Sequence, residues 1–519
     1  MRFLMKQTFI KGTLILIAAS LISRVLGFVY RIFLSRIIGA EGMGLFQMAF
    51  PILILIITIV TAGLPVAISK LVAEAVVENT RRRVRRILYL SFLIVTVLSA
   101  IFTVLLIYYA PMISTTFLQD ERSYYALVAM SPIITIAALS AILRGYFQGL
   151  QNMNPTAVSQ IFEQILRISA VIYFANLWLP KGVEYATAGA MVGMVCGELM
   201  GLIILFAYYL RFRNRPFDTP IVQKVKKQSR RQVLYSIAQT AIPITFSRAI
   251  GSLTYALEPI VIAKSLAIAG VATYAATAYY GQLAGMVIPL LLFPTVFTYS
   301  LSVTLIPSIS EANALEQSKS ITTRVRQSIH FSLIISVYFS VILFTQAELL
   351  GKVLYNQPEI KTALQILAPL GIFLYLQSPL AGILQGLGKA NETMYNSLFG
   401  AIIKLAAVYF LATQPSLGII GAVIAIGISF VSVTLLHLRS TLKYIKVQYP
   451  ISDILKFCFI TVVLILSTVI GNHLFSNSKD WLHVSLVSFC SLVVYILFLL
   501  GMKLLSTEDL IRFKIINRK

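Results

Sequence analysis

Four basic residues lie inside apolar segments of this sequence, where charge is energetically costly. Each interrupts a run that is long enough to cross a bilayer, and the four are Arg24, Arg167, Arg248 and Lys404. A charged side chain inside a membrane span normally faces the protein interior or water, and it marks a functional site by default. Guanidinium groups suit phosphate because their planar fork donates two parallel hydrogen bonds. These residue types therefore indicate a site for an anionic, phosphate-bearing ligand.

The first of these residues, Arg24, lies in the middle of an apolar segment at 13–34. Its depth is roughly 16 Å at about 1.5 Å per residue, which is near the centre of a bilayer. Its polar neighbours on the same helical face are Ser20, Ser23, Gly27 and Arg31. The pattern Ser-Arg-x-x-Gly returns around Arg248 in the segment 233–257. We predict that both arginines contact the ligand.

A polar stripe accompanies Arg167 along the segment 156–178. It consists, at helical spacing, of Thr156, Gln160, Glu163, Gln164 and Arg167, and its later equivalents are Thr393, Ser397, Gly400, Ala401 and Lys404. A polar stripe on a membrane helix must face water, protein or ligand. Two interpretations stay open for Arg167 and Lys404, because Glu163 stands four residues before Arg167 and could neutralise it.

Three carboxylates could serve as ion-coupling sites or as structural partners of the basic residues. They are Glu163, Glu198 in the segment 186–210, and Glu258 near the predicted outer end of the segment 233–257. Buried charges commonly pair with each other, so the structural interpretation is favoured for Glu163 and Glu198.

The elements that must position these residues are membrane-spanning helices. The 519 residues are 58% apolar and only 12% charged, about half the charge of a soluble protein. Apolar segments occur at about 13–34, 44–69, 87–109, 124–146, 156–178, 186–210, 233–257, 282–307, 329–346, 362–386, 394–412, 417–438, 454–474 and 482–504. Each must be helical, because lipid offers the backbone no hydrogen bonds. The sequence predicts an all-α polytopic membrane protein of about fourteen transmembrane helices.

The distribution of Lys and Arg predicts the orientation. Most of them lie in the N-terminal tail and in the even-numbered connections, which places both termini in the cytoplasm. The densest clusters are at 81–86 and 211–231, and they could bind anionic membrane lipids or simply hold the topology. This distribution argues against a nucleic-acid partner despite a net charge of +24. The expected location is a bacterial cytoplasmic membrane.

Sequence blocks in the first half of the chain repeat in the second half. GYFQGL at 145–150 corresponds to GILQGL at 382–387, and VAISKLVAEA at 66–75 to VTLIPSISEA at 303–312. The intervening even number of spans gives the halves the same orientation, a parallel repeat with a site expected between them near the midplane. We predict an N-terminal lobe (1–210), a basic linker (211–231), a C-terminal lobe (232–440), and two further helices with a tail (441–519), the second half carrying extra residues around 258–281.

Several classes of function lack support in the sequence. The four histidines have no metal-ligand spacing, and no glycine-rich phosphate loop appears, so we predict no metal, no cofactor and no enzymatic activity. The three cysteines lie inside apolar segments, where small buried hydrophobes are expected.

Five sequence blocks resemble the family of the stage V sporulation protein B. They are SRVLGFVYR (23–31), IGAEGMGLF (38–46), GLPVAISKLVAEA (63–75), LRGYFQGLQNMNP (143–155) and EPIVIAKSLAIAGVATYAAT (258–277). That family is placed in the superfamily of multidrug, oligosaccharidyl-lipid and polysaccharide (MOP) exporters, and SRVLGF is also similar to the opening helix of MurJ lipid II flippases. The resemblance implies a two-lobed fold of twelve helices plus two, alternating access, and a role in spore-cortex peptidoglycan. Unlike the MurJ pattern, this chain has Tyr30 followed by Arg31, and no arginine at 52–60.

Together these observations predict a flippase for an undecaprenyl-pyrophosphate-linked peptidoglycan precursor. Two other functions remain open: a cation-coupled multidrug exporter that uses Glu163 or Glu198, and a non-transporting scaffold that recruits sporulation or cell-wall synthesis proteins. The four basic residues in the spans favour an anionic ligand over a cation, and the lack of a sizeable soluble domain argues against the scaffold.

Overall fold

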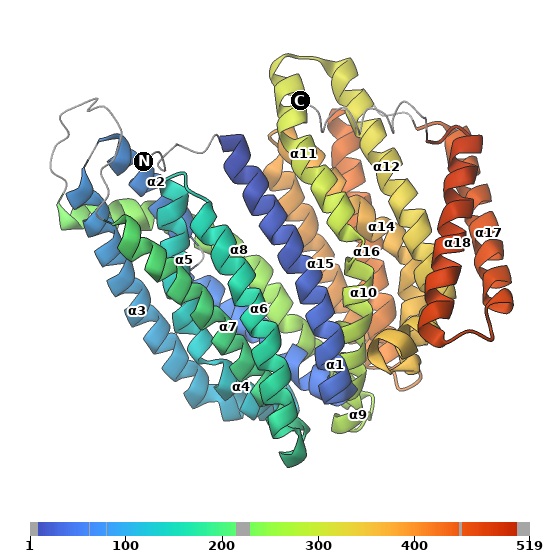
Figure 1. Cartoon of the computed structure of the whole chain (residues 1–519), viewed down its shortest axis with the longest axis horizontal. Helices are drawn as coiled ribbons and strands as arrows, with labels where there is room; N and C mark the ends of the chain where they lie inside the picture. The colour runs from blue at the N-terminus through green and yellow to red at the C-terminus, as the bar shows by residue number, and fades with distance from the viewer. Residues whose placement is uncertain (1–8, 62, 79, 214–228, 446–448, 506–519) are drawn as a thin grey trace. The chain divides into compact units, whose positions relative to one another are not determined.

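The computed structural model describes residues 9–61, 63–78, 80–213, 229–445 and 449–505, and every regular element in these ranges is a helix (Figure 1). The α-helices of the first part are α1 (Phe9–Thr61), α2 (Leu64–Val77), α3 (Arg81–Met112), α4 (Ser123–Met130), α5 (Pro132–Gly149), α6 (Asn154–Trp178), α7 (Val183–Phe212), α8 (Arg230–Ile268) and α9 (Thr273–Tyr280). Those of the second part are α10 (Ile288–Leu292), α11 (Thr295–Ala314), α12 (Ser318–Thr345), α13 (Ala347–Leu350), α14 (Lys361–Gly386), α15 (Ala390–Ala412), α16 (Ile419–Tyr444), α17 (Ile451–Leu474) and α18 (Asp480–Gly501). The all-α fold predicted from the sequence is confirmed.

Eleven helical stretches of the described chain are long and apolar enough to cross a membrane. The predicted total of fourteen spans stays a prediction. α6, α8 and α11 are not among the eleven; the first two carry basic and acidic residues of the predicted site. The fold is nevertheless that of a multi-pass membrane protein.

Three segment boundaries differ from the sequence prediction. α1 joins the first two expected spans across a kink at Gly39, whose φ of +67° favours a residue without a side chain. The second expected span ends earlier than predicted, because α1 stops at Thr61 and α2 begins at Leu64 with Pro65 in its first turn. α8 continues to Ile268, so Glu258 lies well inside this helix and the expected position near its outer end was wrong.

The helices form two compact units, one up to Gly285 and one from Met286 onward. In the first unit α8 and α9 pack with α1 to α7, although the sequence assigns them to the C-terminal lobe. Ser252 of α8, for example, donates a hydrogen bond to Thr58 of α1 (2.9 Å). The predicted lobe boundary at 211–231 stays a prediction, since 214–228 lies outside the described residues.

The repeat found in the sequence recurs in the helix packing of each unit. A Cβ on Gly145 would lie 2.7 Å from the carbonyl oxygen of Pro65, so α5 approaches the backbone of α2 directly. A Cβ on Gly382 would lie 3.0 Å from the carbonyl oxygen of Ser302, so α14 approaches α11 in the same way. The two pairs stand at one constant spacing in the sequence. The same contact therefore holds each half together.

The turns after these glycine helices also repeat. Gln151 and Gly388, at equivalent positions, both adopt left-handed backbone conformations, with φ of 56° and 74°. In each turn a backbone N–H returns to a carbonyl of the preceding helix, from Asn152 to Phe147 (3.0 Å) and from Lys389 to Leu384 (2.8 Å). This is the hydrogen-bond pattern that ends a helix at a left-handed residue. GYFQGL and GILQGL thus each end a helix and lead through a short turn into the next helix.

In the second unit, α17 and α18 pack onto α12. Their apolar contact surface consists of Val337, Val341, Phe457, Ile460, Leu464, Tyr495, Leu499 and Leu504. The hydroxyl of Tyr338 donates to the carbonyl of Ser488 (2.9 Å), and that of Tyr495 donates to the carbonyl of Ile334 (2.8 Å). The two helices that follow the repeat are thus attached to the second unit, with α12 providing the apolar contact.

The repeated glycine contacts generate a stability prediction. Gly145→Ala and Gly382→Ala should each cost about 1–3 kcal/mol, because the new methyl group meets backbone that cannot move away like a side chain. Thermal unfolding in detergent should show two similar decreases in Tm. Gly501→Ala is the control, since no atom lies within 4 Å of its Cβ position. A neutral result at either repeat position would contradict the repeated contact.

Candidate functional site

The polar stripe of α6 faces the protein interior. Thr156, Glu163 and Gln164 are each less than 10% exposed, whereas Phe162 and Ile165 on the other face are 47% and 51% exposed. The amide of Gln164 lies against Gly27 of α1, where a Cβ would be 3.7 Å from its nitrogen. The stripe therefore packs along the helix that carries Arg24. The prediction that it faces protein, water or ligand rather than lipid is consistent with this burial.

Arg167 is held by carboxylates from two helices. Its Nη2 donates to Glu163 of α6 and to Glu198 of α7, the second bond being 2.9 Å long. Arg144 of α5 donates to the other oxygen of Glu163 (2.9 Å), and Arg167 also contacts the amide oxygen of Gln164 (3.3 Å). Two arginines and two glutamates give the cluster no net charge. Of the two interpretations that the sequence left open for Arg167, this geometry favours the structural ion pair.

A glycine stripe on α7 allows this cluster to form. Gly189, Gly193, Gly197 and Gly201 repeat every fourth residue, and each lies against α6. A Cβ on Gly197 would lie 2.6 Å from the Cβ of Arg167, and one on Gly201 would lie 2.9 Å from a carboxylate oxygen of Glu163. Small residues at this spacing let two membrane helices approach closely. The spacing is visible in the sequence and was missed there.

Several polar atoms around the cluster are buried without a hydrogen-bond partner among the described residues. They are Ser23 Oγ, Tyr30 OH, Gln160 Oε1, Arg167 Nε and Glu198 Oε2. An unmade hydrogen bond at a buried group costs about 1–3 kcal/mol, so such atoms normally bind water or a ligand. Four of them belong to residues that the sequence predicted for the site, Ser23, Gln160, Arg167 and Glu198. The region between α1, α6 and α7 thus offers polar groups that a ligand or water can satisfy.

Arg24 and Arg248 both lie in the first compact unit, on α1 and α8, and both have exposed side chains. Each has further polar or electrostatic contacts of its own. The two helices contact each other, for example through the hydrogen bond from Ser252 to Thr58. A direct convergence of Arg24 with Arg248 stays a prediction.

Sequence reasoning missed two residues of this region. They are Arg144 of the cluster and Tyr30, whose buried hydroxyl has no hydrogen-bond partner among the described residues. Arg31 was placed on the face of Arg24 but was not selected as a site residue. Arg144 lies nineteen residues before Glu163 on another helix, a separation without any periodic signal.

The remaining predicted residues divide between the units. Glu258 lies in α8 of the first unit, with a half-buried side chain. Lys404 lies in α15 of the second unit, with a half-buried side chain. Its equivalence to Arg167 by sequence spacing holds, and its convergence with the arginines stays a prediction.

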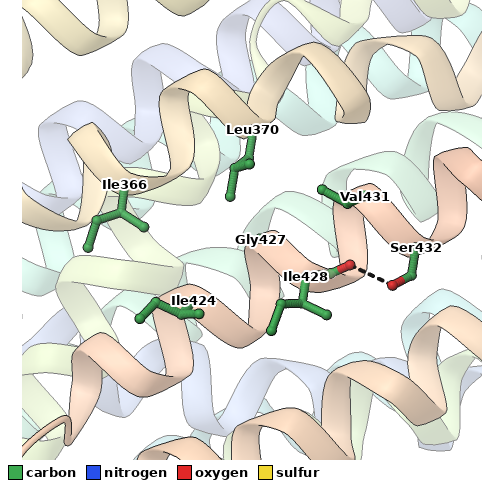
Figure 2. Close-up of a pocket in the computed structure, with 7 residues that line it drawn as sticks. All are labelled: Ile366, Leu370, Ile424, Gly427, Ile428, Val431 and Ser432. Atoms are coloured by element: carbon green, nitrogen blue, oxygen red, sulfur yellow. Dashed lines mark hydrogen bonds between the residues drawn. The ribbon is translucent and has the colours of Figure 1, made fainter.

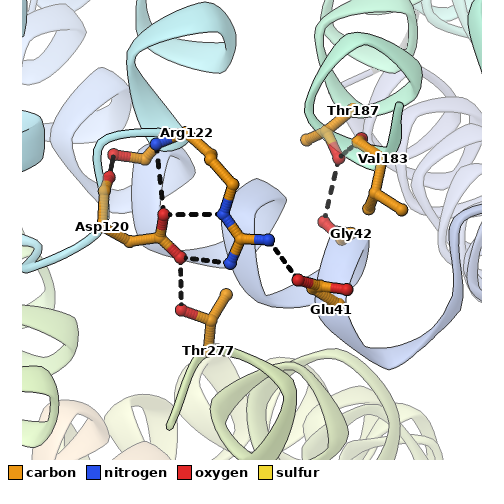
Figure 3. A network of polar contacts seen from close by, with 8 residues as sticks. Glu41, Gly42, Asp120, Arg122, Val183, Thr187 and Thr277 are labelled. Atoms are coloured by element: carbon orange, nitrogen blue, oxygen red, sulfur yellow. Dashed lines mark hydrogen bonds and ion pairs between the residues drawn. The ribbon is translucent and has the colours of Figure 1, made fainter. Parts of the chain in front are cut away.

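A second polar network of the first unit joins segments far apart in the sequence (Figure 3). Asp120 accepts hydrogen bonds from Arg122 (2.8 and 3.0 Å) and from the hydroxyl of Thr277 in α9 (2.7 Å). Arg122 also pairs with Glu41 of α1, next to a hydrogen bond from Thr187 of α7 to the carbonyl of Gly42 (3.3 Å). Hydrogen bonds to Asp120 hold the pKa of the Arg122 guanidinium above its usual range. By the predicted orientation, this network lies at the outer side of the membrane.

A cavity of about 250 Å³ lies in the second unit, between α14 and α16 (Figure 2). Its lining consists of Ile366, Leu370, Ile424, Gly427, Ile428, Val431 and Ser432. The hydroxyl of Ser432 is engaged by the carbonyl of Ile428 in its own helix (2.8 Å). Such a lining offers no donor for a phosphate, so this cavity is not the anion site.

Comparison with known proteins identifies the family. A family model described as "Polysaccharide biosynthesis protein" matches residues 9–313, more than half of the chain. The chain belongs to this family. A second model, described as MatE, matches residues 281–410. The chain is 41% identical to the stage V sporulation protein B of Bacillus subtilis (strain 168) over 514 residues, 99% of each chain.

Solved structures place the family fold among known transporters. A structure of the lipid II flippase MurJ in an inward closed conformation matches with a TM-score of 0.71 at 13% identity, over 93% of this chain and 98% of that one. An inward-facing multidrug resistance MATE family transporter of the MOP superfamily matches with a TM-score of 0.62 at 17% identity, over 81% and 94%. The resemblances seen in the sequence are confirmed. The chain is a multi-pass membrane protein of this family, and its fold is the one seen in these transporters.

The carboxylate cluster generates a prediction that separates its two interpretations. Arg167→Gln should destabilise the protein by about 3–5 kcal/mol, because it leaves Glu198 without its partner and Glu163 with only Arg144. Thermal unfolding in detergent, without any ligand, measures this loss. Arg167→Lys should retain part of the stability, since the ammonium group keeps the positive charge but lacks the two-pronged geometry of the guanidinium. An unchanged Tm for Arg167→Gln would instead favour a role in ligand binding.

Proposed function

We propose that this protein flips a lipid-linked peptidoglycan precursor, an undecaprenyl-pyrophosphate-linked muropeptide, from the inner to the outer leaflet. The observation that carries the proposal is the pair of repeat-related arginines. Arg24 and Arg248 stand on two helices of one compact unit, with exposed side chains at the middle of expected spans. An apolar ligand would gain nothing from a guanidinium at that depth. A pyrophosphate, in contrast, accepts the two parallel hydrogen bonds that each guanidinium can donate.

The proposed transport step requires no nucleotide as a source of energy. Moving negative charge outward across an inside-negative membrane is favoured by about 2.3 kcal/mol per charge per 100 mV. The headgroup would bind among Arg24, Arg248 and the polar atoms of Ser23 and Gln160, while the hydrocarbon chain stays in lipid. The lobes would alternate access around this site.

A role in forming the spore cortex is part of the proposal. It is supported by the name of the relative with 41% identity over nearly the whole chain, which is a sporulation protein. The fold, which this chain shares with a protein named as a lipid II flippase, also supports it. Partners among cell-wall synthesis proteins are compatible with this role.

The main alternative, a cation-coupled multidrug exporter, would need Glu163 or Glu198 as its ion site. Both carboxylates contact Arg167, and Glu163 also contacts Arg144. A cation would have to displace a guanidinium that already neutralises them. This pairing favours the flippase over the exporter.

The proposal predicts that the two central arginines are required for transport but not for folding. Arg24→Ala and Arg248→Ala should each reduce flipping of a purified lipid-linked precursor in liposomes by at least tenfold. A lost hydrogen bond to a charged group costs about 1.5–3 kcal/mol, and about 1.4 kcal/mol corresponds to a factor of ten. Their Tm should stay near that of the parent protein. Arg211→Ala, at the exposed end of α7, is the control. Normal flipping by both variants would exclude the mechanism.

Alternating access makes a second prediction at the network around Asp120. Thr277→Val removes one hydroxyl that α9 donates to Asp120, at a cost of about 1.5–3 kcal/mol to the closed state. Opening of the outer side should rise about tenfold or more. The measurement is labelling, by a membrane-impermeant maleimide, of a cysteine in place of buried Ala276, in a background without the three native cysteines.

The control for this measurement is Thr273→Val, an exposed residue at the start of the same helix. Its labelling rate should equal that of the parent. Equal labelling in the Thr277→Val and Thr273→Val proteins would show that the Asp120 network does not hold the outer side closed.

A further inference from the structure

One face of α3 is exposed along the entire helix. Tyr89, Leu93, Val97, Ile101, Val104 and Tyr108 follow each other at intervals of three or four residues, and each is between 49% and 74% exposed. The opposite face is buried and includes Ile87, Ser91, Val95, Ser99 and Leu106. In a membrane protein, an apolar face with this exposure contacts lipid. α3 therefore belongs to the lipid boundary of the first unit.

Tyrosines mark both ends of this face. Tyr89 and Tyr108 are separated by nineteen residues, which span roughly 28 Å at about 1.5 Å per residue. The hydrocarbon core of a bilayer is about 30 Å thick, and tyrosines are enriched at its two boundaries. The positions of Tyr89 and Tyr108 thus define where this helix leaves the hydrocarbon on each side.

Arg82 and Arg85 extend the same face beyond Tyr89. They precede it by seven and four residues, so they lie on its side of the helix and roughly 6–10 Å further along the axis. Both side chains are exposed. This distance places them at the level of lipid headgroups, in the leaflet that the charge distribution predicts to be cytoplasmic.

Arg83, one residue away, has a different role. It is turned inward with a side chain only 9% exposed, and it forms ion pairs with Glu74 (3.1 Å) and with Glu78. The arginine cluster at 81–86 therefore contains an inward residue that fastens α3 to α2 and an outward pair that does not take part in those ion pairs. If the arginines served only to fix the membrane topology, one inward and two outward side chains would not be required.

We propose that Arg82 and Arg85 form a binding site for the phosphate of an anionic phospholipid in the cytoplasmic leaflet, with Tyr89 against the upper part of its acyl chains. The charge is complementary, since five arginines in this cluster oppose the two glutamates that contact Arg83. A basic residue near an anionic membrane surface contributes about 1 kcal/mol. The site faces the lipid boundary and is separate from the site proposed for the transported substrate.

The experiment measures binding of dioleoyl-phosphatidylglycerol to the purified full-length protein by native mass spectrometry and by its shift of Tm. The parent protein should retain this lipid and gain stability from it, and dioleoyl-phosphatidylcholine should do neither. Arg82→Gln/Arg85→Gln should weaken binding about 30-fold, because two basic residues at about 1 kcal/mol each contribute about 2 kcal/mol. Arg82→Lys/Arg85→Lys should retain most of the binding, because charge rather than a fork is required.

The matched control removes two positive charges elsewhere on the side predicted to be cytoplasmic. Lys319→Gln/Lys389→Gln, both at exposed positions, should bind the lipid like the parent. An equal loss in this control, or equal binding by the Arg82→Gln/Arg85→Gln protein, would overturn the site. A Tm shift of the same size with inorganic phosphate alone would also overturn it, since the lipid would then not be the ligand.

Discussion

A charged group inside a membrane protein must find a partner of opposite charge or water, and this constraint organises the first compact unit. Arg167 meets it through Glu163 and Glu198, and Arg144 completes the charge balance. Because removing ions from water is expensive, the cluster is stable only when its partners approach closely from several helices. α5, α6 and α7 are thereby fixed to each other by charge as well as by packing. The glycine stripe of α7 is the structural condition for this approach.

The second half of the chain solves the same helix crossing without charge. Glu163 corresponds to Gly400, and there the side chain of Val433 fills the space against the glycine. In the first half the glycine, Gly201, lies on α7 and faces Glu163 of α6; in the second half the glycine lies on α15 and faces Val433 of α16. The crossing is thus preserved while its chemistry is replaced. Among these equivalents only Lys404 keeps the charge of its first-half counterpart, Arg167.

Much of the architecture could be predicted from the sequence because it rests on local patterns. Apolar length defined the helices, and the glycine blocks at constant spacing defined a repeat whose contacts recur at Gly145 and Gly382. The polar stripe of α6 was correct because its period is that of a helix. Arg144 could not be found this way, since its contact with Glu163 joins two helices with no common period. The end of α8 was misplaced because Glu258 was taken as a boundary, whereas the helix continues past this half-buried carboxylate to Ile268.

The network around Asp120 shows how such a unit can still change conformation. Its ionic contacts, from Arg122 to Asp120 and to Glu41, connect segments of the first sequence repeat only. The hydrogen bonds that reach into the second repeat include those from Ser252 to Thr58 (2.9 Å), from Thr277 to Asp120 and from Gln47 to the carbonyl of Ala284 (2.8 Å). Each such bond contributes about 1–3 kcal/mol, which thermal motion and ligand binding can offset, whereas the ionic core of the first repeat stays intact. Rigid-body rocking of one repeat against the other would break these hydrogen bonds and leave the ion pairs of Arg122 in place.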